Sequence, residues 1–389
     1  MNFDYKKMDN DYIAGTYGRY DVCIDHGKNA TCFDIDGKEY IDFTSGIGVN
    51  SLGFCDDGWN NAVTNQLGKL QHMSNLYYTE PNIKLAEILC KQTKYSKVFF
   101  ANSGAEANEG AIKIARKKSF DKYGKGRSNI ITLVNSFHGR TITTLSATGQ
   151  DIMHDFFFPF TEGFIYGEAN NTTDVKSKIN NTVCAIMLEF VQGEGGVIPL
   201  EQDFVEQVFA LAKQHDLTII ADEVQTGIGR TGKLLAAEHY GVKPDITTLA
   251  KGLGNGLPIG AILMSKETES VLQKGQHGTT FGGNPIACAG AVEVLSRIDD
   301  SFLKEVTEKS EYLKDKLEAI TEVLKVEGKG LMMGINLTTK TAAEVAAKCA
   351  KQGLLVLTAK EKIRFLPPIT ISKQEIDKGI TIFEKVLEG

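Results

Sequence analysis

Residues 97–120 read KVFFANSGAEANEGAIKIARKKSF and place an apolar run, a polar turn and an amphipathic segment in direct succession. The run KVFFA (97–101) is typical of a buried strand, and residues 105–120 repeat apolar side chains with the helical period. Strand and helix patterns continue to alternate through the middle of the chain. This alternation predicts an α/β protein with a mainly parallel sheet between helices.

Five more segments have strand patterns: NIITLV (129–134), TVCAIML (182–188), LTIIA (217–221), DITTLA (245–250) and IGAILM (259–264). Residues 203–215, DFVEQVFALAKQH, have a helix pattern. Near the N-terminus, ATCFDIDGKEYIDF (30–43) alternates around Asp36-Gly37, which predicts an antiparallel hairpin. We expect a large domain over residues 66–289 and a small α+β domain built from residues 1–65 and 290–389.

The composition is that of an ordinary globular protein. Of 389 residues, 42% are apolar and 24% are charged, and a net charge of −6 gives no reason to expect nucleic acid or an anionic membrane as a partner. No apolar run reaches the roughly 18 residues of a membrane span, and MNFDYKKMDNDY (1–12) has no secretory pattern. The seven cysteines are scattered, without a C-x-x-C pair, so we expect reduced thiols in a cytoplasmic protein and no metal site.

Polar and glycine-rich segments follow five of the predicted strands. They are NSGAEANE (102–109), NSFHGRT (135–141), EFVQGEGG (189–196), DEVQTGIGRTG (222–232) and KGLGNG (251–256). Open parallel sheets bind ligands at the carboxyl ends of their strands. We therefore expect these five segments to meet at one site.

The first of these segments offers an anion site. Ser103, Gly104 and Ala105 stand at a strand-to-helix junction, where free amides and the helix dipole can hold a phosphate. A serine in this position is also an ordinary helix N-cap. The residues alone favour neither interpretation.

Lys251 and Asp222 each follow an apolar strand. A carboxylate in that place needs a cation or a strong donor, and the stretch between the two residues is long enough for one crossover, so they can emerge from neighbouring strand ends. The glycines after Lys251 allow close approach of the backbone. Three interpretations of the lysine stay open: a solvated side chain, a phosphate contact, or a covalent amine, because a partly desolvated lysine can lose its proton and react with a carbonyl.

The segment GIGRTG (227–232) matches a dinucleotide-binding pattern literally and, with Lys233, nearly matches a phosphate-binding loop. However, Leu234 stands where a magnesium-binding Ser or Thr belongs, and Asp222 and Glu223 separate the glycines from the strand. Their negative charge would repel a pyrophosphate. The sequence therefore argues against nucleotide binding here.

Seven motifs taken together resemble a known family. They are SGAEANE (103–109), FHGRT (137–141), VQGEGG (191–196), IIADEVQTGIGRTG (219–232), TLAKGLGNGLPIGA (248–261), GTTFGGNP (278–285) and IRFLPPI (363–369), and they extend across about two-thirds of the chain. Their order and spacing closely resemble the class III, ornithine-type aminotransferases. The resemblance implies the fold type I architecture of pyridoxal phosphate-dependent transferases, with a mainly parallel seven-stranded sheet, and pyridoxal 5'-phosphate as cofactor.

The resemblance also implies roles at the cofactor. Lys251 would bind it covalently and then carry the proton between substrate and cofactor. Asp222 would pair with the pyridine nitrogen, so that the ring acts as an electron sink. The phosphate would be bound by Ser103, Gly104 and Ala105, the ring would stack on Phe137, and its hydroxyl would contact Gln225. Thr280 of the partner subunit would complete the phosphate site, so the resemblance implies at least a homodimer.

On the substrate side, SNLYYTEP (74–81) narrows the resemblance to members that transfer the terminal amino group of N-acetylornithine to 2-oxoglutarate in arginine biosynthesis. Arg140 and Arg364 would each bind a carboxylate of glutamate. Glu194 would pair with Arg364 while the ω-amino substrate is bound and move away for glutamate, with Glu189 as a support.

Two further residues bear on the choice of substrate. Tyr77 belongs to the segment placed to accept the acylated branch of the substrate. Ile47 offers no hydrogen bond to a charged α-ammonium, which favours an acylated amine. Alternatively, Ile47 only packs in the core, and an isoleucine here also fits enzymes of 4-aminobutyrate.

The sequence departs from the family pattern at GFCDDGW (53–59), where G-H-C-H-P is common, and at Phe190, where proline is usual. The resemblance places both departures near the rim of the site, so they bear on substrate contacts more than on the reaction. Transfer from succinylornithine, ornithine or 4-aminobutyrate stays an alternative, as does, more remotely, a non-catalytic nucleotide-binding protein using GIGRTGK.

Overall fold

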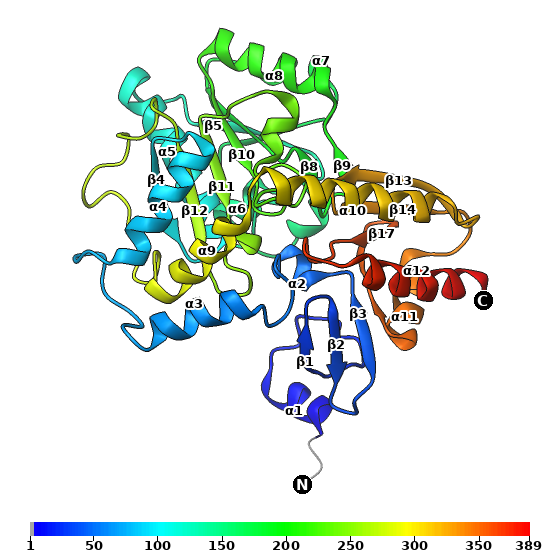
Figure 1. Cartoon of the computed structure of the whole chain (residues 1–389). Helices are drawn as coiled ribbons and strands as arrows, with labels where there is room; N and C mark the ends of the chain where they lie inside the picture. The colour runs from blue at the N-terminus through cyan, green and yellow to red at the C-terminus, as the bar shows by residue number, and fades with distance from the viewer. Residues whose placement is uncertain (1–3) are drawn as a thin grey trace.

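A seven-stranded sheet forms the centre of the computed structural model, which describes residues 4–389 (Figure 1). In spatial order its strands are β4 (Lys97–Ala101), β12 (Gly260–Met264), β11 (Ile246–Leu249), β10 (Thr218–Asp222), β7 (Val183–Leu188), β5 (Asn129–Leu133) and β6 (Phe164–Gly167). Strand β12 runs antiparallel to β4 and β11, and the pairs from β11 to β6 are parallel. The predicted mainly parallel sheet is confirmed, with all six predicted strands correct to within one residue at each end; β6 was missed.

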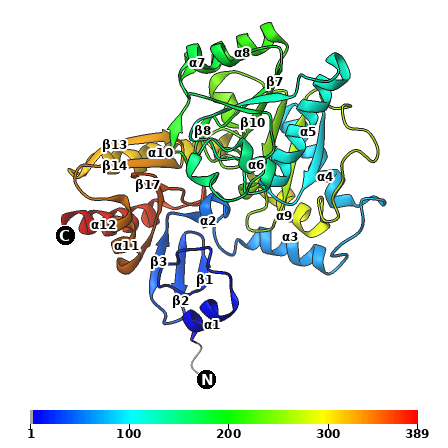
Figure 2. The ribbon, with the colours of Figure 1, turned by 180° about the vertical axis from the view of Figure 1, so that it is seen from behind.

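Helices cover both faces of this sheet. Neighbouring residues of β10 point to opposite sides: Ile220 packs with helix α5 (Gly104–Tyr123), whereas Ile219 packs with helix α8 (Gln202–His215). Helices α4 (Glu80–Thr93) and α9 (Pro285–Arg297) cover the β12 end on the same side as α8. Seen from behind, α5 lies against the strands (Figure 2). The α5 and α8 helices confirm the two predicted helix patterns.

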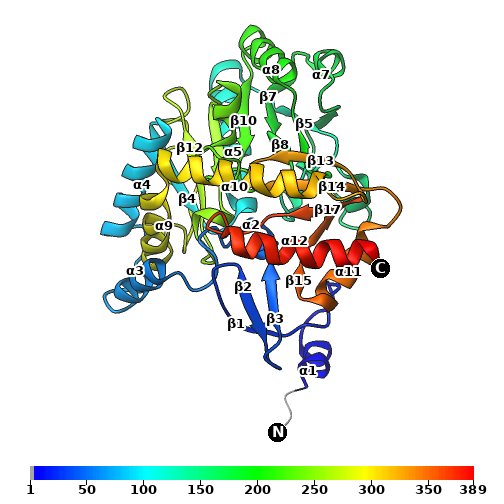
Figure 3. The ribbon, with the colours of Figure 1, turned by 45° about the vertical axis from the view of Figure 1, so that its right-hand side comes forward.

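The C-terminal part of the chain forms a second, smaller α+β unit. Its four-stranded sheet contains β13 (Val323–Lys329), β14 (Met332–Leu337), β17 (Lys362–Phe365) and β16 (Leu357–Ala359), and its helices are α10 (Asp300–Glu318), α11 (Ala342–Gln352) and α12 (Lys373–Glu388). Helices α10 and α12 lie in front of these strands in Figure 3. Their apolar faces share one core with Phe365 and Ile335.

Both ends of the chain meet in a third sheet. Strands β1 (Ile24–Lys28), β2 (Thr31–Asp34) and β3 (Glu39–Asp42) are antiparallel, and β15 (Leu354–Leu355) pairs in parallel with β3. The β2–β3 pair confirms the predicted hairpin, and Gly37 in its turn has a φ of +81°.

The domain limits stay a prediction. The expected boundaries after residues 65 and 289 fall inside α3 (Asp57–Leu67) and α9, which pack against each other.

The structure also contains several shorter elements. They are α1 (Tyr5–Tyr12), α6 (Ile142–Ala147), α7 (Thr172–Lys178), β8 (Val191–Gln192), β9 (Ile198–Pro199) and the 3-10 turns η1 (Asp151–Met153), η2 (Ala236–Tyr240) and η3 (Lys251–Leu253). From residue 4 onward, no helix combines the length and apolar character needed to cross a membrane.

A single helical turn, α2 (Ser45–Gly48), lies between the N-terminal sheet and the large sheet (Figure 1). All four of its residues have positive φ values, including +67° at Ile47. Glycine adopts such values freely, but a β-branched residue does so only under strain. The turn is held by backbone bonds from Gly48 to Thr44 and from Val49 to Ser45.

Candidate active site

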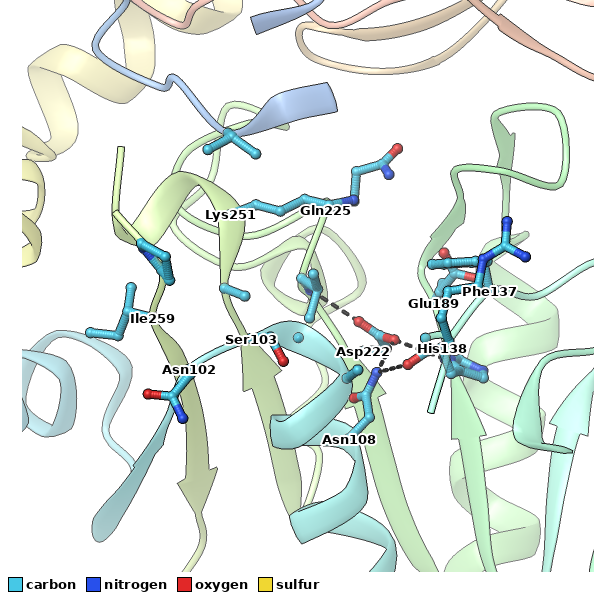
Figure 4. A pocket seen from close by; sticks show the side chains of 18 of the residues that line it. Asn102, Ser103, Asn108, Phe137, His138, Glu189, Asp222, Gln225, Lys251 and Ile259 are labelled. Carbon is cyan, nitrogen blue, oxygen red and sulfur yellow. Dashed lines mark hydrogen bonds and ion pairs between the residues drawn. The ribbon is translucent and has the colours of Figure 1, made fainter. Parts of the chain in front are cut away.

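A cavity of about 400 Å³ lies at the carboxyl ends of the parallel strands, where the polar segments were predicted to meet. Segments that follow β4, β5, β7, β10 and β11 contribute to its walls (Figure 4). Of the predicted site residues, those that line it are Ser103, Gly104, Ala105, Phe137, Arg140, Glu189, Asp222, Gln225 and Lys251.

Lys251 follows β11 and opens the turn η3, with a φ of +41°. Burial lowers the pKa of its amine, and the Glu194 carboxylate acts in the opposite direction. A lowered pKa increases the fraction of neutral, nucleophilic amine. A Cβ on the neighbouring Gly252 would lie 2.4 Å from Ser51 Oγ, so that serine side chain would have to move. This position favours the covalent amine over a solvated lysine.

Asp222 ends β10, the neighbour of β11, and is paired in register with Thr248. The two side chains Asp222 and Lys251 therefore emerge from adjacent strands, as predicted. Asp222 Oδ1 accepts from the Val224 amide at 3.0 Å, while Oδ2 accepts from Asn108 Nδ2 at 2.7 Å and from His138 Nδ1 at 2.8 Å (Figure 4). Asp222 Oδ2 is thus held by two side chains, one from α5 and one from the segment after β5.

Glu194 and Arg364 form a bidentate ion pair between the large sheet region and β17. The distances are 2.6 Å from Nη1 to Oε1 and 3.2 Å from Nη2 to Oε2. Gln225 joins the pair to the cavity: it donates to Glu194 at 3.4 Å and accepts from Arg364 at 3.3 Å. Burial acts to raise the pKa of Glu194, but the Arg364 charge outweighs it and holds that pKa below its ordinary value.

The N-terminus of α5 forms another wall of the cavity. Ser103 Oγ accepts from the Glu106 amide at 3.2 Å, so the serine does cap the helix. Gly104 and Ala105 follow in the first turn, whose amides have no partner within the helix and attract anions. A Cβ on Gly104 would lie 2.7 Å from Val224 Cγ1, so the glycine lets Val224 pack closely against the start of the helix. The cap and the anion site are therefore compatible.

On the side away from Ser103, Phe137 and Glu189 face the cavity (Figure 4). The Phe137 amide donates to Glu189 at 2.9 Å, and the Gly193 amide donates to the same carboxylate at 3.3 Å. The Arg140 guanidinium lies 5.6 Å from the centre of the Phe137 ring. Burial raises the pKa of Glu189 to about 7, although His138 acts to lower it. Glu189 thus ties Phe137 to the turn that carries Glu194.

Three predicted residues, Ile47, Tyr77 and Thr280, are exposed and lie outside the cavity lining. Ile47 lies in α2, whose Gly48 is close to Gln225. Asn75 Nδ2 donates to the Thr279 and Gly282 carbonyls at 3.3 and 2.9 Å, so the segments around Tyr77 and Thr280 lie side by side. The roles expected of these residues stay predictions.

The segment GIGRTG is enclosed by protein. Arg230, 2% exposed, donates from Nη1 to the Leu331 carbonyl at 3.0 Å and to the Pro367 carbonyl, and from Nη2 to Ser45 Oγ at 3.4 Å. The Leu331 amide in turn donates to the Arg230 carbonyl at 3.0 Å. The segment joins the large sheet region to the smaller unit, which agrees with the prediction against nucleotide binding.

Three polar residues that lie behind Asp222 were not predicted: Asn108, His138 and Thr248. Asn108 interrupts the buried apolar stripe of α5 that continues through Ala111 and Ala115. That interruption is a signal the sequence contains. Thr248 has no such signal, since threonine is ordinary in a buried strand.

Fold and site together define a fold type I pyridoxal phosphate-dependent transferase. A family model described as aminotransferase class-III matches residues 12–387. The acetylornithine aminotransferase of Haemophilus ducreyi is 52% identical over 384 residues, 98% of each chain. The crystal structure of N-acetylornithine aminotransferase from Stenotrophomonas maltophilia has a TM-score of 0.86 and 34% identity, covering 98% of both chains. The ornithine aminotransferase from Toxoplasma gondii has a TM-score of 0.94 and 31% identity, covering 99% of this chain and 94% of that one. This chain belongs to the class III aminotransferases.

The residues of the cavity fit pyridoxal 5'-phosphate, the cofactor of this family. An amine with a lowered pKa, a hydrogen-bonded carboxylate and a helix N-terminus face one space, and a Cβ on Gly104 in that N-terminus would clash with Val224. These are the groups that an aldehyde, a ring nitrogen and a phosphate require.

Proposed function

We propose that this chain is an acetylornithine aminotransferase of arginine biosynthesis, acting in the cytoplasm. It moves the terminal amino group of N-acetylornithine to 2-oxoglutarate and yields N-acetylglutamate semialdehyde and glutamate. The observation that carries the proposal is the Glu194–Arg364 ion pair beside the Lys251 cavity. A site that admits an ω-amino donor and glutamate in turn needs a carboxylate-binding arginine that can be covered and uncovered. Relatives named acetylornithine aminotransferase support the same substrate.

At the cofactor, the chain supplies a nucleophile and a counter-charge. When bound, pyridoxal 5'-phosphate supplies an aldehyde that links to amines and a ring that accepts an electron pair. Lys251 Nζ would hold the cofactor covalently and, when released, would carry the proton between the cofactor and the substrate carbon that bears the amino group. Asp222 would stabilise positive charge on the ring nitrogen. Ser103, Gly104 and Ala105 would bind the phosphate.

On the substrate side, Arg140 and Arg364 bind the carboxylates of glutamate. Glu194 covers Arg364 while N-acetylornithine is bound, which prevents that substrate from entering in the wrong direction. Phe137 would stack on the ring, and Glu189 supports Phe137 through its amide. Gln225, which contacts the ion pair, would also contact the ring hydroxyl.

The role of Lys251 has a direct chemical test. Borohydride is expected to fix the cofactor covalently to the wild type but not to Lys251→Ala, as read by mass spectrometry. The variant should retain no more than a trace of turnover. Covalent fixation at another residue in Lys251→Ala would contradict the assignment.

We further propose a homodimer with shared sites, in which Thr280 of the partner subunit completes the phosphate site. The exposed, adjacent segments around Tyr77 and Thr280 support this arrangement. Mixing Lys251→Ala with Thr280→Ala chains is expected to restore activity, because each mixed dimer then contains one intact site. No recovery in verified mixed dimers would contradict shared sites.

A substrate panel tests the choice of donor. Next to Ile47, a charged α-ammonium loses water without gaining a hydrogen bond, at a cost of about 1–3 kcal/mol, whereas an acylated amine is neutral. We expect kcat/KM for N-acetylornithine to exceed that for ornithine by roughly 5- to 150-fold. Succinylornithine should be only modestly worse, and 4-aminobutyrate poor. Equal kcat/KM values for ornithine and N-acetylornithine would contradict the proposal.

A further inference from the structure

Behind the cavity, the side-chain amide of Asn108 is fully hydrogen-bonded. Asn108 is 1% exposed, and its Oδ1 accepts from Thr248 Oγ1 at 2.7 Å. Its Nδ2 donates to Asp222 Oδ2 at 2.7 Å and to the His138 carbonyl at 2.7 Å. An asparagine amide has two donor hydrogens, and both are used. The amide therefore holds Asp222 and the His138 backbone at the same time.

Thr248 determines which way this amide faces. The threonine hydroxyl is completely buried and donates to Asn108 Oδ1, so the NH₂ group must point to the Asp222 carboxylate. Thr248 lies directly opposite Asp222 in the β10–β11 pairing, and its carbonyl accepts from the Glu223 amide at 3.0 Å. The strand pairing thus places the donor that orients Asn108.

The buried surroundings make this orientation matter. A carboxylate taken out of water is unstable unless donors compensate it. Asp222 Oδ2 has two such donors, Asn108 and His138, and each approaches within 2.8 Å. Without Asn108, only His138 would hold this oxygen, and the His138 backbone would also lose a partner.

We propose that Asn108 and Thr248 are positioning residues, which hold the Asp222 carboxylate in place at the cavity for a cationic ring nitrogen. This inference rests on the proposed role of Asp222 at the cofactor. Thr248 in β11, Asn108 in α5 and Asp222 in β10 form one chain of hydrogen bonds from the sheet to the cavity.

The chain offers a matched pair of variants. Thr248→Val removes the hydroxyl that orients Asn108 and keeps the shape of the side chain. Thr247→Val makes the same change one residue earlier, where the hydroxyl is equally buried but bonds to Tyr95 at 2.7 Å. A purely structural contribution to stability would appear in both variants, whereas an effect through Asp222 would appear only in Thr248→Val.

Two readouts report on the ring nitrogen and on binding. The ¹⁵N resonance of ring-labelled pyridoxal 5'-phosphate, bound to each holoenzyme, distinguishes a protonated from an unprotonated nitrogen. In Thr248→Val and in Asn108→Leu we expect this resonance to move toward the unprotonated value and the cofactor dissociation constant to rise by about five- to tenfold. In Thr247→Val both should match the wild type to within about twofold in affinity.

Asp222→Ala separates this inference from the proposal it rests on. If the resonance moves in Asp222→Ala but stays at the wild-type value in Thr248→Val, the positioning role of Asn108 and Thr248 is overturned and the role of Asp222 stands. If the resonance does not move in Asp222→Ala, the role of Asp222 is overturned, and the positioning role with it.

Discussion

Four consecutive positive φ values, from Ser45 to Gly48, place Ile47 in a left-handed conformation that costs a β-branched residue about 1–2 kcal/mol. Ile47→Gly relieves this strain, which offsets the apolar contact it removes. We expect the free energy of unfolding to fall by no more than about 0.5 kcal/mol. The comparison variant is Ile83→Gly, since Ile83 is 53% exposed, similar to the 43% of Ile47, but lies within helix α4. It should lose about 1 kcal/mol or more.

The same variant tests the pocket. With glycine at position 47, water can reach a charged α-ammonium, so the preference for N-acetylornithine over ornithine should shrink. If Ile47→Gly leaves the ratio of kcat/KM for N-acetylornithine to kcat/KM for ornithine unchanged, and loses as much stability as Ile83→Gly, Ile47 only packs against its neighbours.

A second residue, Glu223, makes the free energy of unfolding depend on pH. Its buried carboxylate accepts from Thr226 Oγ1 at 3.1 Å and from the Ala236 and Ala237 amides at 2.6 and 2.9 Å, and burial raises its pKa to about 7. Because the folded-state pKa exceeds the unfolded value of about 4.3, the folded state binds the proton more tightly. The stabilisation is complete below pH ~4 and is lost as the pH rises through about 7, at most by about 4 kcal/mol.

Glu223→Gln removes this titration. The glutamine places a donor where an acceptor stood, so it should lower the free energy of unfolding at pH 5 by about 1–3 kcal/mol. The further loss between pH 5 and pH 8 should, however, be smaller than in the wild type. Denaturant unfolding of both proteins at the two pH values measures this difference. Equal losses would show that Glu223 does not titrate in this range.

Among the elements, the β8–β9 hairpin and strand β17 meet through Glu194 and Arg364. Glu194→Ala would leave Arg364 uncovered in both half-reactions. Glutamate should then bind at least as well as in the wild type, while N-acetylornithine should bind in the wrong direction and react at least about tenfold more slowly. Single-turnover measurements follow each half-reaction separately, and the glutamate half-reaction serves as the control for the N-acetylornithine half-reaction. Equal losses in both would exclude a gating role.

The elements also show what the sequence predicts well. The strands were located to within one residue because long apolar runs and turn residues mark them. Strand β6 was missed because FIYG (164–167) is a short edge strand whose neighbouring residues 156–160 are equally aromatic. The antiparallel direction of β12 has no signature in its own residues, since periodicity carries no direction.

In the candidate site, too, the residues that local patterns mark were predicted, and contacts between distant segments were not. Residues within motifs, such as Lys251 and Asp222, were placed at one cavity by the strand-end argument alone. The Asn108–Thr248 contact joins positions 140 residues apart, and only the folded chain brings them together. Tyr77 and Thr280 lie outside the cavity lining, and their roles stay predictions.

For the whole molecule, Arg230 connects the large sheet region to Ser45, Leu331 and Pro367. Burial lowers the pKa of Arg230, and the negative charge of the buried Asp42 acts to raise it. Arg230→Met is expected to reduce the free energy of unfolding by about 1–3 kcal/mol, because the buried Leu331 and Pro367 carbonyls lose their donor. Arg230→Lys keeps the charge but not the fork of donors, so it should fall in between.

Substitution of Arg230 should also shift the position of Arg364, since Pro367, which Arg230 binds, is three residues from Arg364. We expect KM for glutamate to rise more than kcat falls in Arg230→Lys. Asp42→Asn combined with Arg230→Met should lose less stability than the sum of the two single variants. Additive losses would mean that the two charges do not interact.

The sheet that unites both ends of the chain has a consequence in time. Ile41 in β3 pairs with Leu354 in β15, more than 300 residues later. At a synthesis rate of about 5–20 residues per second, the β3 edge waits roughly 15 to 60 seconds on the ribosome before its partner exists. Arg364 emerges later still, so a nascent chain that has already made Lys251 and Asp222 has no complete substrate pocket. During that interval the open strand edge is available to chaperones or to pairing with another nascent chain.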